Sequence, residues 1–142
     1  MKLQDIMSRS VISIHPEETV AVAARTLERN NIGVLPVCGE NGRLCGVVTD
    51  RDLVTRCVAA GRSPENTKVR EIMTGKVFTA TADMDTDQAA QLMGKQQIRR
   101  LPVVENGVLR GMVSLGDLAV RQECSPKAAD ALGSISHNVS SR

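Results

Sequence analysis

The stretch GVVTDRDL, from Gly46 to Leu53, decides how this sequence is interpreted, and GMVSLGDL, from Gly111 to Leu118, repeats it. In each stretch a glycine and an apolar pair predict a short buried strand. A hydroxyl residue follows, with an aspartate three residues after it, which is the spacing of a capping box at a helix start. The two pairs are Thr49 with Asp52 and Ser114 with Asp117.

The same two residue types also suit a ligand site. The carboxyl end of a strand that opens into a helix presents backbone N–H groups and the positive end of a dipole, and both favour anions such as phosphate. A hydroxyl at this place can donate to a phosphate oxygen, and a carboxylate one turn later can accept the hydroxyls of a ribose. Capping and ligand binding are compatible, because one hydroxyl can serve both.

The two stretches belong to a long internal duplication. Segment 3–14 matches 69–80, and NIGVLPV at 31–37 matches QIRRLPV at 97–103, both with an offset of 66. From Gly46 and Gly111 onward the offset is 65, because one residue is missing from the second turn. Each copy is too short to bury much surface alone, so the two are expected to cover one another's apolar faces.

Both copies predict the order β-α-β-β-α, an α/β (α+β) fold. The hairpin turns are Gly-Glu-Asn-Gly and Glu-Asn-Gly, which are strong hairpin signals. We expect repeat 1 at 1–63, repeat 2 at 64–123, and a tail at 124–142 with a short helix near 128–132. The expected elements are extended stretches at 11–14 and 77–80, a first helix at about 19–30 with a counterpart carrying Ala89 to Met93, strands at 34–37 and 44–49, and second helices at about 51–60 and 115–122.

Composition excludes several classes of protein. The net charge of +2 is too small to indicate nucleic-acid binding, and Phe78 is the only aromatic residue. No apolar run approaches a membrane span or a signal peptide, so we expect a cytoplasmic protein with no membrane partner. No nucleophile–histidine arrangement or phosphate-loop motif is visible, so no catalytic residue is assigned and a non-enzyme is expected. The four cysteines, expected to be free thiols with no metal assigned, are Cys38, Cys45, Cys57 and Cys124.

The duplicated pattern resembles a tandem pair of CBS domains, the Bateman module. The motifs that carry the resemblance are DIM, NIGVLPV and GVVTDRDL in the first copy, and EIM, QIRRLPV and GMVSLGDL in the second. It covers about residues 1–123 and is similar to the stand-alone bacterial type. It implies two repeats packed about a pseudo-twofold axis, leaving clefts that bind adenosine-containing ligands. AMP, ADP or ATP are expected, and S-adenosylmethionine or NAD are alternatives, as regulatory ligands rather than cofactors.

The resemblance also implies roles for individual residues. Thr49 and Ser114 would contact phosphate, and Asp52 and Asp117 would accept the ribose hydroxyls. The residues expected to line the adenine pockets are Ser10, Val11, Ile12, Leu35, Pro36, Lys76, Val77, Phe78, Leu101 and Pro102. Phe78 either stacks on the base or belongs to the core.

The two copies differ in charge. Arg99 and Arg100 replace Gly33 and Val34 of the first copy, and Arg51 stands where the second copy has a glycine. These guanidinium groups either bind phosphate or form an ordinary solvated surface. We expect both sites to bind ligand, with different preferences.

The leading hypothesis is a regulatory nucleotide-binding module that acts by conformational change, forms a homodimer and informs an unidentified regulated protein. An alternative is a structural or protein-interaction module with vestigial nucleotide sites. Nucleic-acid binding and a redox sensor built on the thiols are weaker alternatives. Nucleotide-dependent stabilisation, the salt dependence of nucleic-acid affinity and thiol-alkylation rates distinguish them.

Overall fold

The computed structural model describes residues 1–120 and 125–140, and the chain divides into two compact units. The repeat-1 unit is Ile12–Val77, and the repeat-2 unit combines Met1–Val11 with Phe78–Arg142. These units differ from the sequence repeats 1–63 and 64–123, because the segment that opens each sequence repeat packs with the other repeat. Duplication and packing therefore follow different boundaries.

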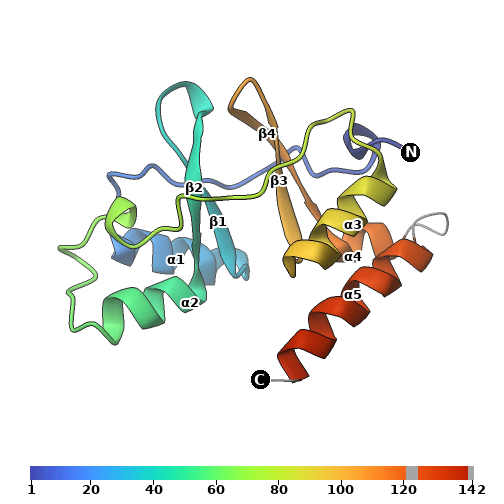
Figure 1. Ribbon diagram of the computed structural model, residues 1–142. Helices are drawn as coiled ribbons and strands as arrows, with labels where there is room; N and C mark the ends of the chain where they lie inside the picture. The colour runs from blue at the N-terminus through green and yellow to red at the C-terminus, as the bar shows by residue number, and fades with distance from the viewer. Residues whose placement is uncertain (121–124, 141–142) are drawn as a thin grey trace. The chain divides into compact units, whose positions relative to one another are not determined.

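The repeat-1 unit is a β-hairpin with helices beside it (Figure 1). Its hairpin pairs β1 with β2 in antiparallel register, with Val34 opposite Thr49. The second strand agrees with the predicted 44–49, and the first extends one residue beyond the predicted 34–37. The described elements are α1 (Val20–Asn30), β1 (Val34–Cys38), β2 (Leu44–Thr49) and α2 (Asp50–Asp52), and α2 continues into a π-helix (Leu53–Val58).

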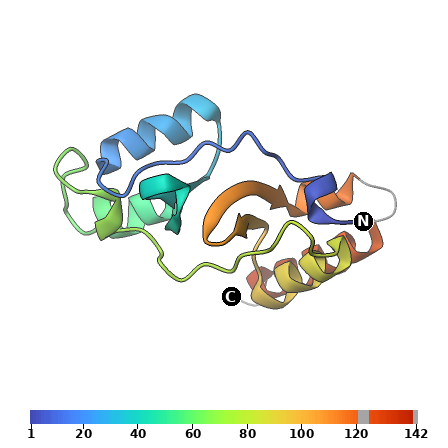
Figure 2. The same cartoon turned by 90° about the horizontal axis from the view of Figure 1, so that it is seen from above.

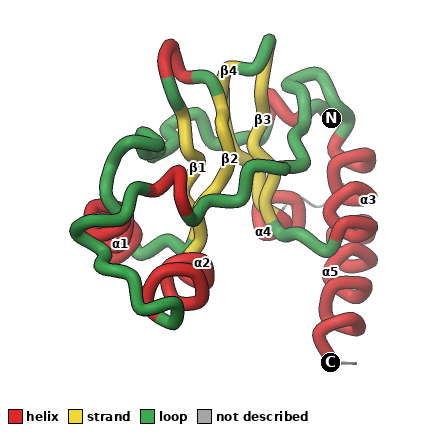
Figure 3. Tube along the Cα trace, turned by 60° about the vertical axis from the view of Figure 1, so that its left-hand side comes forward, coloured by secondary structure: helices red, strands yellow, loops and turns green. Residues whose placement is uncertain are grey.

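The repeat-2 unit has the same order and one further helix. Its hairpin pairs β3 with β4, and Arg100 lies opposite Ser114. Figure 3 shows both hairpins in yellow. The described elements are α3 (Thr86–Gln96), β3 (Arg100–Glu105), β4 (Val108–Ser114), α4 (Leu115–Ala119) and α5 (Ser125–Ser140). The predicted second helix at 115–122 begins as expected but ends at Ala119, before Val120, and positions 121–122 of the prediction lie outside the described part of the chain.

Local chemistry explains where these elements begin and end. The Thr19 side chain accepts a hydrogen bond from the N–H of Val22 at 3.2 Å and caps α1. The first helices of both repeats end at residues in the left-handed conformation, Asn31 (φ 52°) and Gln97 (φ 58°). The tight turn between β3 and β4 uses Asn106 and Gly107 at positive φ, as the Asn-Gly signal predicts.

The predicted extended stretches at 11–14 and 77–80 form one residue pair each rather than full strands. Ile14 pairs in parallel with Val37, and Ala80 pairs in parallel with Val103. Short isolated pairing suffices there, because each stretch only passes the edge of a two-stranded sheet.

The opening segments are exchanged between the two repeats. Ser8 pairs with Met112 in the repeat-2 unit, and Thr74 pairs with Val47 in the repeat-1 unit. The backbone N–H of Leu3 also donates to the carbonyl of Met84 at 2.9 Å. Each repeat is therefore completed by a segment that precedes the other repeat in the sequence.

Each unit has its own apolar core.

The predictions for the second helix of the first repeat and for the helix of the tail need correction. The single helix expected at 51–60 is a short α-helix followed by a π-helix that buries Leu53 and Cys57. The tail forms α5, which is longer than the predicted 128–132. Figure 2 shows α5 beside α3. Its buried residues Ala128, Ala131 and Ile135 join the core of the repeat-2 unit, which stabilises the additional turns.

Candidate functional site

The hydroxyl–aspartate pairs form the predicted capping boxes in both units. In the repeat-1 unit, Thr49 Oγ1 accepts from the N–H of Asp52 at 3.1 Å, and Asp52 Oδ2 accepts from the N–H of Thr49 at 3.0 Å. In the repeat-2 unit, the matching distances for Ser114 and Asp117 are 3.0 Å and 2.9 Å. The structural interpretation of the motif is therefore confirmed.

This geometry leaves donor and acceptor capacity for a ligand. Each hydroxyl accepts the capping bond on its oxygen, so its proton remains able to donate to an anion. Each carboxylate uses Oδ2 for the cap, which leaves Oδ1 as an acceptor. The arrangement can therefore bind a phosphate oxygen beside a sugar hydroxyl, and the ligand role of these four residues stays a prediction.

The segments predicted to line the adenine pockets include the two places where the chain passes from one unit to the other. The chain leaves the repeat-2 unit between Val11 and Ile12 and returns between Val77 and Phe78. Ser10, Ile12, Lys76 and Phe78 are exposed, and Val11 and Val77 are half-buried. Phe78 is 47% exposed and lies outside both apolar cores, so its ring is accessible for stacking.

The apolar residues expected in the same pockets lie deeper in the protein. Leu35 and Leu101 are fully buried in the cores of their units, and Pro36 and Pro102 are buried beside them. The carbonyl of Pro36 accepts from Ile14, and that of Pro102 accepts from Ala80. Their clear role is to support the hairpins, and a ligand contact stays a prediction.

The arginines predicted to contact phosphate are exposed. Arg51, Arg99 and Arg100 form no ion pair within residues 1–120, where the structure describes their surroundings. Their guanidinium groups are therefore open to an anion, although nothing in the geometry assigns one to a particular cleft.

The difference between Gly33 in the first repeat and Arg99 in the second is accompanied by a second difference nearby, at Asp50, which the sequence analysis missed. In the repeat-1 unit, Asp50 Oδ2 lies 3.3 Å from where a Cβ on Gly33 would stand. In the repeat-2 unit the equivalent pair is Arg99 and Leu115, so a side chain is present at the first position and the acid is absent at the second. Aligning the two repeats at these two positions would have revealed this compensation.

A second missed residue is Arg56, one helical turn after Asp52. Its Nε lies 3.8 Å from Asp52 Oδ1, the oxygen that the cap does not use. The i,i+4 spacing was the available signal.

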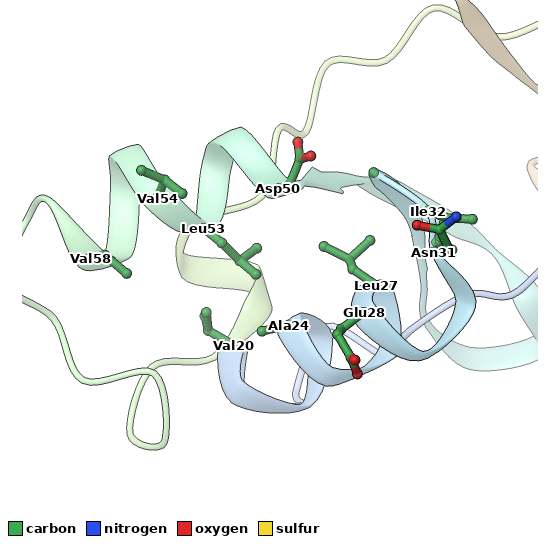
Figure 4. A pocket seen from close by; sticks show the side chains of 11 residues that line it. Val20, Ala24, Leu27, Glu28, Asn31, Ile32, Asp50, Leu53, Val54 and Val58 are labelled. Carbon is green, nitrogen blue, oxygen red and sulfur yellow. The ribbon is translucent and has the colours of Figure 1, made fainter.

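An open groove lies on the helical side of the repeat-1 unit (Figure 4). It encloses about 810 Å³ between α1 and the helical segment 50–58. None of the predicted nucleotide-site residues lines it. The lining residues are Val20, Ala24, Leu27, Glu28, Asn31, Ile32, Gly33, Asp50, Leu53, Val54 and Val58.

The described cysteines, Cys38, Cys45 and Cys57, are free thiols. Cys57 is fully buried, and burial raises the pKa of the Cys38 thiol, which disfavours the reactive thiolate. Cys45 is exposed, and Cys124 lies outside the described residues. Within the described residues, no group of three or more histidine, cysteine or acidic side chains is placed to hold a metal ion.

No helix in the described part of the chain combines the length and apolar character that crossing a membrane requires.

Comparison with known proteins assigns the family. The CBS domain model matches residues 3–59 and 69–122. CBS domain-containing protein YhcV of Bacillus subtilis is 41% identical over 135 residues, covering 95% of both chains. A crystal structure of Hypoxic Response Protein I with two coordinated zinc ions aligns with a TM-score of 0.77 and 33% identity, covering 84% of this chain and 97% of that one.

A hexameric CBS-CP12 protein from bloom-forming cyanobacteria aligns with a TM-score of 0.71 and 28% identity, over 87% of this chain and 72% of that one. Pairs of CBS domains are in general regulatory modules. The two matched segments, the two hairpin units and these similarities agree, and the chain belongs to the CBS domain family as a tandem pair of the stand-alone bacterial type.

Proposed function

We propose that this chain is a regulatory, non-catalytic module that binds adenosine-containing ligands, of the AMP, ADP or ATP type, and informs a partner protein by conformational change. The observation that carries the proposal is the repeated capping geometry. Both Thr49–Asp52 and Ser114–Asp117 keep a hydroxyl proton and a carboxylate Oδ1 available beside a strand end. Two copies of one constellation suit a ligand that has both phosphate and ribose.

Ligand-dependent thermal stabilisation tests this proposal. A ligand at 100 times its Kd should stabilise the protein by about 2.7 kcal/mol, because it binds only the folded state. We expect a shift with at least one of AMP, ADP, ATP, S-adenosylmethionine or NAD. The shift should be lost in Asp52→Ala or Asp117→Ala, which identifies the repeat that supplies the ribose acceptor.

The control separates capping from binding. Gln88 completes a capping box at the start of α3, where no ligand contact is predicted. Gln88→Ala should lower the melting temperature and leave the ligand-induced shift unchanged. If no ligand in the panel shifts the wild-type protein, the alternative holds: an interaction module with vestigial nucleotide sites.

We also propose that the chain forms a homodimer through the groove of the repeat-1 unit. Internal comparison supports this surface. With offsets of 66 and 65, Ala24 corresponds to Ala90, Glu28 to Gly94, and Leu53 to Leu118. In the repeat-2 unit this helical face is covered by α5, and Ala90 is 1% exposed there. The uncovered face of the repeat-1 unit exposes Val54 and Val58.

The groove favours a second copy over a helix like α5. A Cβ on Gly94 would lie 3.1 Å from Ala131 Cα, so the close approach of α5 favours glycine at this position, whereas the repeat-1 unit has the long side chain of Glu28. Exposed Arg25 and Arg29 flank Glu28 on the same helix. Two α1 helices related by a twofold axis can therefore offer opposite charges to each other.

Val54→Glu is expected to convert the dimer to a monomer in light-scattering measurements, because a charge would be buried at the interface. Val54 is 59% exposed in the single chain, so the substitution should leave the folding of the protein unaffected. Val120→Glu is the matched control, since Val120 is 82% exposed and lies off the groove. A wild-type monomer, or a dimer that tolerates Val54→Glu, would contradict this interface.

A further inference from the structure

Arg56 connects the site carboxylate of the repeat-1 unit to a backbone segment. Its Nη1 donates to the carbonyl of Ile72 at 3.2 Å and to that of Met73 at 3.3 Å. On its other side, Nε faces Asp52 Oδ1 at 3.8 Å. One rigid guanidinium group therefore contacts the predicted ribose acceptor and a segment sixteen residues further along the chain.

The segment that Arg56 contacts is held firmly against the hairpin. The N–H of Val47 donates to Thr74 at 3.0 Å, and the N–H of Thr74 donates back at 2.9 Å. Gly46 permits this approach because it lacks a Cβ. The chain then runs directly into Lys76 and Val77, which are predicted to line the adenine pocket.

The contacts of Asp52 are divided between its two oxygens. Oδ2 accepts from the N–H of Thr49 in the capping box, and Oδ1 faces Arg56. A ribose hydroxyl that donates to Oδ1 would share this oxygen with Arg56. A ribose hydroxyl bound at Oδ1 would therefore lie next to the guanidinium group of Arg56.

We propose that Arg56 is a positioning residue, which orients Asp52 Oδ1 toward a ribose and couples its occupancy to the Ile72–Thr74 segment. This inference rests on the proposed adenylate binding. In this inference the Arg56 side chain links the bound ligand to the Ile72–Thr74 segment, which continues toward the second repeat. Lysine at this position would keep the charge but lose the planar group that reaches both partners.

Ribose-dependent binding tests the proposal. AMP, ADP and ATP would each be titrated by calorimetry beside the 2′,3′-dideoxy form of the same nucleotide. Arg56→Gln should weaken binding of the ribonucleotide about tenfold and leave the dideoxy form nearly unchanged, because only the ribose contact loses its orientation. Arg56→Lys should show the same selective loss.

Arg70→Gln is the matched control, because Arg70 lies just before the Ile72–Thr74 segment and its Nε contacts Glu17 Oε1 at 3.0 Å instead of Asp52. It should preserve the preference for ribonucleotide. Hydrogen exchange adds a second measurement: the amides of Met73 and Thr74 should respond to nucleotide in the wild-type protein and not in Arg56→Gln.

The possible failures are distinguishable. Equal weakening of both nucleotide forms in Arg56→Gln, or no weakening, overturns the role of Arg56 and leaves the proposed function intact. If wild-type protein binds none of the nucleotides, the proposed function fails and this inference fails with it.

Discussion

Gly46→Ala protein is expected to be less stable than wild type by about 3 kcal/mol, a large effect for one added methyl group. The new Cβ would overlap the carbonyl oxygen of Thr74 and lie 3.1 Å from its carbonyl carbon. Both atoms belong to backbone, which cannot move aside as a flexible side chain can. The two hydrogen bonds between Val47 and Thr74 would therefore open. Chemical denaturation measures the change in the free energy of unfolding.

Gly75→Ala is the matched control for this substitution. A Cβ on Gly75 would meet no atom within 4 Å, although Gly75 follows Thr74 directly. Its stability should stay within about 0.5 kcal/mol of wild type, as for most surface substitutions. Equal stability of both variants would show that the Ile72–Thr74 segment does not pack closely on β2.

Leu3→Ala is expected to destabilise the protein by about 3 kcal/mol, and the damage should appear in the second repeat. Leu3 has no exposed surface and belongs to the core cluster that contains Leu101 and Val103. Hydrogen exchange should accelerate in β3, β4 and α3, whereas β1, β2 and α1 should change little. Because Leu3 precedes the first repeat in the sequence, its position along the chain alone would predict faster exchange in β1, β2 and α1 instead.

Val69→Ala is the counterpart in the other unit. Val69 is also fully buried, and it belongs to the core of the repeat-1 unit with Leu35 and Val48. Its loss should accelerate exchange in β1, β2 and α1. If Leu3→Ala instead loosens the first repeat, the exchange of opening segments is wrong.

Features governed by neighbouring residues could be predicted from the sequence. The strand boundaries at Leu44 and Thr49 agree, because β-propensity and the adjacent turn define them. The capping boxes at Thr49 and Ser114 formed as expected, because each requires only residues three apart. The family resemblance was likewise readable from motifs within single repeats, and it is confirmed.

Features that depend on distant contacts could not be predicted in this way. The tail pattern near Ala128 indicated a short helix, yet α5 extends to Ser140 because its apolar face packs on α3 and α4. The continuation of α2 as a π-helix and the contact of Arg56 with Ile72 have no local signal. Hydrophobic periodicity identifies an apolar face but not the element that covers it.

The sequence by itself determined the duplication, the two hairpins, the helix caps and the family, because each depends on short-range geometry repeated twice. Only the tertiary structure decided that Leu3 completes the second repeat and Val69 the first. It also decided that α5 covers one helical face while the equivalent groove beside Val54 stays open. The physical reason is that burial of apolar surface is non-directional, so the choice of partner depends on which surfaces fit in three dimensions.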